Sequence, residues 1–289
     1  MSLMRRLLNP YLRVMEKRRL RNAKSPEALR RALEVNARLF FLPRGRGFAK
    51  AEIAGVPVLR RDGAAPIVLY FHGGGYVFGS PRTHKAMLAQ IARRLDCALI
   101  LPNYRKAPED PFPAAVDDAI AVYRAVMDTP GGVVLGGDSA GGGLAFALLA
   151  EILRLGLPLP KGLFAFSPLT DLTGSGDSLR SNAALDVVLP AERTEDMTEM
   201  YLQGADPKDP RASPLFASFY DAPPVWICAG DTEILLDDTR RMAEHLRAQD
   251  VQVTEVIAHD LPHVWPIFHT LLPEARATLD EVAAWIRRL

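Results

Sequence analysis

The chain has 289 residues, of which 48% are hydrophobic and 24% charged, a balance typical of a soluble globular protein with a large core. A formal net charge of +1 gives no general attraction to nucleic acid or to anionic membranes. No apolar run approaches the roughly 20 residues that span a bilayer, so stable membrane insertion is not expected either.

The cysteines and the N-terminal segment bear on the compartment. Cys97 and Cys228 lie in apolar, strand-like runs, so we expect buried free thiols rather than a disulfide. The N-terminal segment carries basic residues but lacks the uninterrupted apolar stretch of a secretory signal. Together these features predict a cytoplasmic location.

Residues 4–42 have the spacing of amphipathic helices. The first segment is basic, and Ser25-Pro26-Glu27 begins a second helix with a capping residue followed by proline. We interpret the basic side chains as a solvated face. A helix that lies on a membrane surface is the alternative.

The rest of the chain alternates strand and helix patterns. Two short runs on either side of Gly55, within 49–61, predict an antiparallel hairpin at a sheet edge. Continuous apolar runs, typical of strands buried on both faces, follow at 67–71, 97–101, 133–135, 162–166 and 225–229, and a last strand is predicted at 251–257. Helical spacing occurs over 83–95, 113–127, 144–155, 237–249 and 273–288. This order predicts an α/β fold with a mostly parallel eight-stranded sheet, helices on both faces, and reactive groups at the carboxyl ends of the strands.

One interval interrupts this alternation. Between the strands at 162–166 and 225–229 there is no strand pattern, but there is apolar spacing at 185–189 and a predicted helix at 191–201. A helical insertion above the carboxyl edge of the sheet would form a cap. We therefore expect N-terminal helices that contribute to the cap (1–45), a core in two parts (46–170 and 216–289) and a cap insertion (171–215).

Residues 132–144 combine a strand, a tight turn and the start of a helix around Ser139. The apolar run stops at glycines, Ser139 lies between Gly137 and Gly141, and an alanine-rich helical run follows. A serine on such a sharp turn needs small neighbours two residues away, and its hydroxyl is held above the sheet edge near the positive end of the helix. The alternative is a glycine-rich turn with an incidental serine, and the motif alone does not decide between them.

A serine nucleophile needs hydrogen-bond donors for the oxyanion that it produces. His72-Gly73-Gly74-Gly75-Tyr76 directly follows a buried strand, and contiguous glycines let backbone N–H groups turn toward a ligand. We assign the oxyanion hole to the N–H groups of Gly74, Gly75 and Ala140. A phosphate-binding loop is the alternative; it is disfavoured because no G-K-[ST] follows and the glycines are not spaced as G-x-G-x-x-G.

A base must remove the hydroxyl proton, and six histidines are available. His263 lies in the middle of the loop after the last strand, where the catalytic base is found in sheets of this kind. We favour it over His259, which is close to the strand end, and His269, which is on or near the next helix. We expect His72 to hydrogen-bond within the glycine loop. We expect His84 and His245 to be surface residues on helices.

An acid that orients the base should follow the strand at 225–229. Asp231 and Glu233 lie in the turn itself. Asp237 and Asp238 precede a helical run, so we expect them to cap that helix and to interact with its dipole. Asp171, after the preceding strand, is a further alternative, and spacing leaves the choice open.

These segments, taken together, resemble the hormone-sensitive lipase family of α/β-hydrolase esterases, also called family IV bacterial esterases. The resemblance covers most of the chain and is carried by 72–76 (H-G-G-G-Y), 103–109 (N-Y-R-K-A-P-E), 112–118, 137–142 (G-D-S-A-G-G), 167–169 (S-P-L) and 262–264 (P-H-V). Lys106 and Asp110 depart from the leucine and histidine that are common in the second block. That block is mainly structural, so the departures leave the chemistry unaffected.

The resemblance implies a serine hydrolase. It makes Ser139 the nucleophile and His263 the base, and its G-x-x-[DE]-x-L-x-D-[DE] block, laid on residues 230–238, puts the acid at Glu233. The order serine, acid, histidine is the usual one for this fold. The resemblance further implies a carboxylesterase acting on short- to medium-chain acyl esters and a homodimer formed through the last strand and its neighbouring helix.

No metal-ligand motif such as H-E-x-x-H or C-x-x-C occurs, so we expect no metal and no cofactor. The expected partner is a small-molecule ester, and nucleic acid is not expected. Tyr76, Leu185 and Val188 are the candidate substrate-binding residues, with packing inside the cap as the alternative for the cap residues. Two other functions stay open: an amidase or acyl-sugar deacetylase on the same scaffold, and a ligand receptor that has lost catalysis, which the presence of His263 disfavours.

Overall fold

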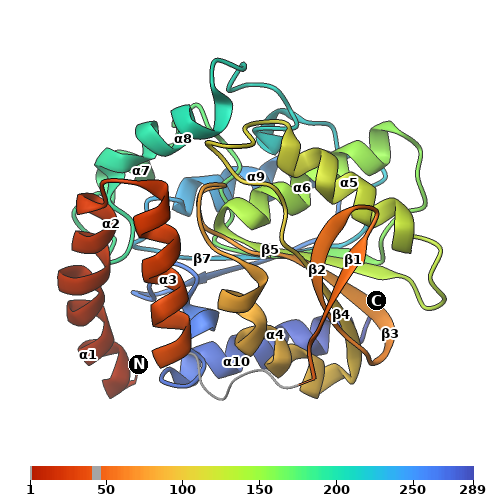
Figure 1. Cartoon of the computed structure of the whole chain (residues 1–289), viewed down its shortest axis with the longest axis horizontal. Helices are drawn as coiled ribbons and strands as arrows, with labels where there is room; N and C mark the ends of the chain where they lie inside the picture. The colour runs from red at the N-terminus through yellow and green to blue at the C-terminus, as the bar shows by residue number, and fades with distance from the viewer. Residues whose placement is uncertain (1, 41–46) are drawn as a thin grey trace.

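The computed structural model describes residues 2–40 and 47–289 (Figure 1). Within these residues a single sheet is formed by β1 (Ala49–Ile53), β2 (Val56–Arg61), β3 (Ala64–Phe71), β4 (Cys97–Pro102), β5 (Val133–Asp138), β6 (Gly162–Phe166), β7 (Val225–Gly230) and β8 (Val253–Ala258). The strand order across the sheet is β1-β2-β4-β3-β5-β6-β7-β8.

The sheet is antiparallel only at one edge. β1 pairs with β2 and β2 with β4 in antiparallel fashion, whereas the pairs from β4 through β8 are all parallel. β5, β6 and β7 are buried along their whole length. Burial on both faces explains their continuous apolar runs. The predicted eight-stranded, mostly parallel sheet with an edge hairpin is confirmed.

Helices cover both faces of the sheet, as Figure 1 shows. α5 (Ala114–Val126), α6 (Ser139–Arg154) and α9 (Leu236–Arg247) share one core, which includes the fully buried Phe146 and Met242. α4 (Pro81–Leu95) and α10 (Pro273–Ile286) share the other, which includes Met87 and Leu279. The molecule is therefore a three-layer α/β structure.

Two further groups of helices lie near the carboxyl edge of the sheet. The first consists of α1 (Leu3–Tyr11), the π-helical turn η1 (Leu12–Lys17), α2 (Arg18–Asn22) and α3 (Pro26–Phe40). The second consists of α7 (Ser178–Ser181), the 3₁₀ turn η2 (Ala191–Arg193), α8 (Thr194–Leu202) and the 3₁₀ turn η3 (Pro214–Phe216). A last 3₁₀ turn, η4 (Trp265–Phe268), precedes α10. Figure 1 shows the N-terminal helices beside α7 and α8.

Two basic side chains of the N-terminal helices are buried and do not belong to the solvated face that we expected, whereas Arg6, Arg13, Arg18 and Arg21 are exposed as expected. Arg5 and Lys17 are each only 5% exposed. Arg5 pairs with Asp260 (3.2 Å), and the Lys17 ammonium donates to the backbone oxygens of Ala183 and Asp186, both at 2.7 Å. These cations hold the helix to the protein because buried carbonyl oxygens need donors.

The N-terminal helices also expose apolar side chains. Leu3, Leu7 and Val14 are 71%, 62% and 59% exposed, whereas Leu8 and Leu12 are buried. The exposed side of these helices is therefore partly basic and partly apolar.

The described residues answer two further expectations. Cys97 and Cys228 are buried and unbonded, as expected. Within residues 2–40 and 47–289, no helix has both the length and the apolar character needed to cross a bilayer. The end of the predicted N-terminal helical segment at residue 42 and the predicted domain boundary at residue 45 fall outside the described residues.

Candidate active site

Ser139 lies on a sharp turn between β5 and α6. Its φ is +52°, in the left-handed region that residues other than glycine rarely adopt. The two flanking glycines are required by close backbone contacts. A Cβ on Gly137 would lie 2.2 Å from the carbonyl oxygen of Gly141, and a Cβ on Gly141 would lie 2.2 Å from that of Phe71. The predicted strand, turn and helix are present, and they hold the serine at the carboxyl end of a central strand.

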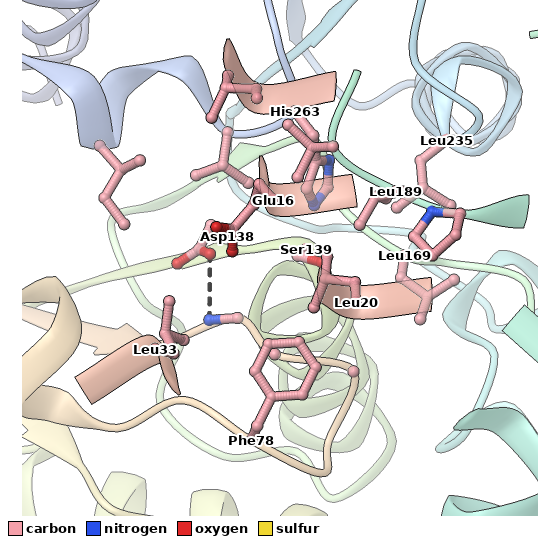
Figure 2. A pocket seen from close by; sticks show the side chains of 18 of the residues that line it. Glu16, Leu20, Leu33, Phe78, Asp138, Ser139, Leu169, Leu189, Leu235 and His263 are labelled. Atoms are coloured by element: carbon pink, nitrogen blue, oxygen red, sulfur yellow. Dashed lines mark hydrogen bonds between the residues drawn. The ribbon is translucent and has the colours of Figure 1, made fainter. Parts of the chain in front are cut away.

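A cavity of about 460 Å³ opens over this turn. Figure 2 shows Asp138, Ser139 and His263 on its wall, with leucine side chains and Phe78 around them. Most of the lining is apolar. The N-terminal helices contribute the part of the wall formed by Met4, Leu7, Leu8, Tyr11, Leu12, Leu20, Leu29 and Leu33.

Sequence reasoning did not identify this wall. Its signal was the recurrence of leucine at helical spacing in residues 8–33, from which we expected amphipathic helices contributing to the cap but named no cavity-lining residue. The same helices bring one carboxylate, Glu16, to the cavity, where Arg19 donates to it.

His263 and Glu233 form a buried pair. Nδ1 of His263 lies 2.7 Å from Oε2 of Glu233, and the two side chains are 7% and 1% exposed. Burial alone would lower the pKa of His263, but the hydrogen bond and the charge of Glu233 outweigh it and raise this pKa above the ordinary imidazole value.

The other ring nitrogen of His263, Nε2, is left for the cavity, which His263 lines together with Ser139. No hydrogen bond joins these two side chains among the described contacts. In unliganded acyl-transfer sites such bonds are often long and tighten only when substrate is bound.

Two donors fix the other oxygen of Glu233. Oε1 accepts from the Ser167 hydroxyl (2.8 Å) and from the Gly230 N–H (2.6 Å). The Ser167 oxygen in turn accepts from the N–H of Val264 (3.2 Å), the residue after His263. Ser167 therefore connects the acid to the loop of the base. Sequence reasoning gave it no role, although it follows β6 directly in the S-P-L segment.

The other candidate acids have different partners. Asp231 contacts the exposed His259, with 2.6 Å between Oδ2 and Nδ1. Asp237 accepts from the N–H of Ser178 at 2.8 Å. Neither aspartate contacts His263.

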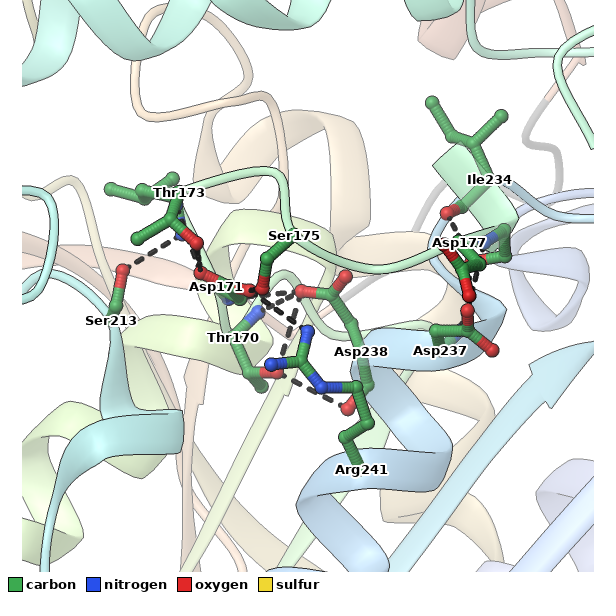
Figure 3. A network of polar contacts seen from close by, with 12 residues as sticks. Thr170, Asp171, Thr173, Ser175, Asp177, Ser213, Ile234, Asp237, Asp238 and Arg241 are labelled. Carbon is green, nitrogen blue, oxygen red and sulfur yellow. Dashed lines mark hydrogen bonds and ion pairs between the residues drawn. The ribbon is translucent and has the colours of Figure 1, made fainter. Parts of the chain in front are cut away.

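Asp171 and Asp238 belong to a polar network that joins the start of the insertion to α9 (Figure 3). Asp238 Oδ1 accepts from the N–H groups of Thr170 (2.7 Å) and Asp171 (2.9 Å), and Asp171 pairs with Arg241 at 2.9 Å. Burial raises the pKa of Asp238 to about 7. The expectation that Asp237 and Asp238 cap α9 is wrong, because their oxygens bind the chain after β6 and α9 has no side-chain cap.

In the part of the chain that is described, no group of three or more His, Cys, Asp or Glu side chains is arranged to hold a metal ion.

The glycine loop also borders the cavity. Gly74 and Gly75 have φ values of +125° and +58°, which favour glycine. The Gly74 carbonyl accepts from the N–H groups of Val77 (3.0 Å) and Phe78 (2.9 Å). Because the C=O and N–H of a planar peptide point in opposite directions, the Gly75 N–H faces away from those residues. Within residues 2–40 and 47–289, neither glycine N–H has a backbone or side-chain acceptor. Ala140 is in the first turn of α6, where N–H groups lack intrahelical partners.

The helical histidines differ from expectation. His84 is 3% exposed, and its Nε2 lies 3.2 Å from Oδ2 of Asp138. It is buried because α4 turns this side toward the sheet. His245 is half-buried, with Nε2 2.7 Å from the carbonyl oxygen of residue 217. His72 hydrogen-bonds within the glycine loop, as expected.

Two of the three candidate pocket residues line the cavity. Tyr76, whose ring stacks on Tyr201 of α8 with centroids 3.9 Å apart, and Val188 both belong to the lining. Leu185 does not, and it is 50% exposed. It lies in the turn whose carbonyl oxygens bind the N-terminal helix, while its side chain faces solvent. Met197 of α8 is also part of the lining.

Comparisons with known proteins find ester hydrolases. A family model described as an α/β hydrolase fold matches residues 68–267. An acetyl-hydrolase of Streptomyces hygroscopicus is 38% identical over 231 residues, which cover 79% of this chain and 77% of that protein. An esterase of Acinetobacter venetianus is 33% identical over 274 residues, which cover 92% and 90%. The crystal structure of an esterase from the bacterial hormone-sensitive lipase family has a TM-score of 0.92 and 34% identity, covering 100% of this chain and 98% of that one.

Proposed function

This chain belongs to the bacterial hormone-sensitive lipase family of α/β-hydrolase esterases and is an ester hydrolase, and we propose that it works through a triad of Ser139, His263 and Glu233. One observation carries the mechanism. The buried Glu233 lies 2.7 Å from His263, and His263 lines the same cavity as Ser139.

The first half of the reaction forms an acyl-enzyme. Ser139 Oγ attacks the ester carbonyl carbon while Nε2 of His263 takes the hydroxyl proton. Glu233 keeps the other imidazole proton on Nδ1 and stabilises the imidazolium. The tetrahedral intermediate then expels the alcohol, which receives its proton from His263, and the acyl group remains on Ser139.

The second half releases the acid. His263 removes a proton from water, the hydroxide attacks the acyl carbon, and the acid leaves as His263 returns the proton to Ser139. In both halves the N–H groups of Gly74, Gly75 and Ala140 bind the oxyanion. Two observations support this assignment. The Gly75 N–H faces away from Val77 and Phe78, and neither the Gly74 N–H nor the Gly75 N–H has a protein acceptor in the described residues. One such donor is worth about 10²–10³ in rate.

We propose short- to medium-chain acyl esters as substrates. The cavity lies within the roughly 300–1,000 Å³ range of small-ligand sites and is mainly apolar, with Tyr76 and Val188 in its wall. Similarity to an acetyl-hydrolase supports the inclusion of acetyl esters among the substrates. With p-nitrophenyl acetate, butyrate, octanoate and laurate, kcat/KM should be highest for butyrate or octanoate. A maximum at laurate, or comparable turnover of the matching anilides, would contradict this substrate class.

Replacement of the nucleophile tests the mechanism. Ser139→Ala should abolish hydrolysis of p-nitrophenyl butyrate while thermal unfolding stays that of a folded protein. The exposed Ser218→Ala should behave as wild type. A fluorophosphonate should label wild type on the peptide that contains Ser139 and should not label the variant. Undiminished turnover by Ser139→Ala would refute the proposal.

Three expectations of organisation also become proposals. The helices at 1–45 and the insertion at 171–215 act together as a cap, supported by the bonds from Lys17 to the carbonyls of residues 183 and 186. The chain forms a homodimer through β8, whose outer edge has no neighbouring strand in the described sheet; a monomer mass in light scattering would exclude it. The free buried thiols fit a cytoplasmic location, which cell fractionation tests.

A further inference from the structure

The residue before the nucleophile, Asp138, is a buried carboxylate that the triad does not use. It is 2% exposed and ends β5. Its Oδ1 accepts from the Tyr70 hydroxyl at 2.8 Å. Its Oδ2 lies 3.1 Å from the Gly73 nitrogen and 3.2 Å from Nε2 of His84. Figure 2 shows Asp138 next to Ser139 on the cavity wall.

The three donors come from three different parts of the fold. Tyr70 is in β3, His84 is in α4, and Gly73 begins the loop that carries the proposed oxyanion hole. A Cβ on Gly73 would lie 2.3 Å from Asp138 Oδ2 and 3.0 Å from the Cβ of Ser139. The loop therefore lies directly against the nucleophile turn, and the carboxylate of Asp138 attaches it there.

Fixing Gly73 fixes the two peptides that follow. The Gly73 carbonyl is 2.9 Å from Nδ1 of His72, and the Gly74 carbonyl is held by the N–H groups of Val77 and Phe78. Each following N–H points the opposite way from its carbonyl. The Gly73–Asp138 bond thus sets the position of the loop relative to Ser139, while the carbonyl bonds set the direction of its N–H groups.

A carboxylate at this place would be unfavourable without a counter-charge. Its negative charge would oppose the negative charge that develops on the oxyanion next to it. Burial would lower the pKa of His84, but the charge and hydrogen bond of Asp138 outweigh it and raise this pKa, so the pair favours the imidazolium form. The rings of His72 and Tyr70 lie 5.7 Å and 6.5 Å from that of His84, and Glu34 adds a favourable charge.

We propose that Asp138 and His84 are positioning residues for the oxyanion hole: Asp138 holds the Gly73 N–H and so places the Gly74 and Gly75 donors against Ser139, and His84 neutralises Asp138. This inference rests on the proposed serine mechanism and assigns a role to residues outside its triad. Both residues act on the transition state and leave binding of the ester ground state unchanged.

The test compares kcat and KM for p-nitrophenyl butyrate with the inhibition constant of an aryl trifluoromethyl ketone, which adds to the serine as a tetrahedral oxyanion. Asp138→Ala should lower kcat about 10²-fold, the value of one oxyanion donor, with KM within about threefold. Its ketone affinity should fall in proportion to kcat/KM. Asp138→Asn should lose less, because its amide oxygen can still accept the Gly73 N–H.

A rescue experiment isolates the role of charge. His84→Ala leaves the Asp138 carboxylate without its cation and should lower kcat more than tenfold. Adding Asp138→Asn should restore part of that loss, since the residue is then neutral. The exposed His259→Ala is the matched control and should change kcat less than about twofold. If Asp138→Ala does not fold, the single and double His84 variants decide the matter.

Three results would overturn the inference: kcat of Asp138→Ala or His84→Ala within twofold of wild type, a loss confined to KM, or no rescue in the double variant. Unchanged ketone affinity in a slow variant would do the same. Failure of the serine mechanism would show separately, as turnover by Ser139→Ala.

Discussion

Replacing Glu233 by glutamine tests the proposed triad without changing the size of the side chain. Oε1 of Glu233 accepts from two donors, the Ser167 hydroxyl and the Gly230 N–H. A glutamine keeps its carbonyl oxygen on those donors and presents its NH₂ group to Nδ1 of His263. Nδ1 must then accept instead of donating, so the imidazole proton moves to Nε2. That is the nitrogen that must take the proton of Ser139.

The magnitude follows from the cost of turning the amide round. In the productive orientation the NH₂ group would face the two donors, which would both be buried without an acceptor. Each such group costs about 1–3 kcal/mol, so the productive orientation is disfavoured by about 2–6 kcal/mol. At about 1.36 kcal/mol per tenfold, this is a factor of about 30 to 10⁴. The corresponding change of aspartate to asparagine in a serine protease triad costs about 10⁴ in kcat. We therefore expect a fall of about 10²–10⁴.

Initial rates of p-nitrophenyl butyrate hydrolysis give kcat and KM for this comparison. Asp231→Asn is the matched control, because Asp231 is a carboxylate of the same turn that contacts the exposed His259. It should keep kcat within about twofold, and both variants should unfold cooperatively. The reasoning is refuted if Glu233→Gln keeps more than about a tenth of wild-type kcat, or if Asp237→Asn costs more.

Three further outcomes are expected. Because Glu233 raises the pKa of His263, and the base must be neutral, the acid limb of kcat/KM should lie above the ordinary imidazole value and move to lower pH in Glu233→Gln; an unmoved limb contradicts the pairing. The pKa of Asp238 is raised to about 7 from an unfolded value of about 3.9, so the neutral acid is favoured in the fold and its stabilisation is lost as pH rises through about 7. The Tm of Asp238→Asn relative to wild type should therefore increase between about pH 5 and pH 8, and a constant difference would argue against it. Lys17→Met removes the donor from one buried and one part-buried carbonyl, so trypsin should cut the N-terminal helices faster than in the exposed control Lys24→Met; equal rates would show that Lys17 does not secure them.

The parts of the fold that sequence predicts well are those with a local cause. β5, β6 and β7 are buried on both faces, so an unbroken apolar run marks each of them. The nucleophile turn is local in part: the backbone of Gly141, four residues away, requires Gly137, whereas the end of β3 at Phe71 requires Gly141. An apolar run and a glycine-flanked serine can both be read from the sequence alone.

The residues that sequence misplaces owe their position to distant partners. His84 is in a helix with exposed basic residues, and its burial depends on Asp138, which is 54 positions away. Asp237 and Asp238 sit where helix-capping residues are common, but they bind a segment about sixty residues earlier. Glu233 and Asp231 were indistinguishable by spacing, and the family block singled out the residue that contacts the cavity histidine.

The hydrogen bonds that attach the N-terminal helix constrain the side chains of that helix more than the side chains of the residues to which it binds. Arg13 donates to the main-chain oxygens of Ala184 (2.5 Å) and Leu185 (3.1 Å), and Lys17 to those of Ala183 and Asp186. A carbonyl oxygen is supplied by any amino acid. Mutational drift at 183–185 is therefore tolerated, whereas positions 13 and 17 must keep long cationic side chains. The bonds made by Arg13 and Lys17 do not involve the leucines that wall the cavity. Exchange of those leucines to alter the ester accepted therefore leaves the bonds that hold the helix in place.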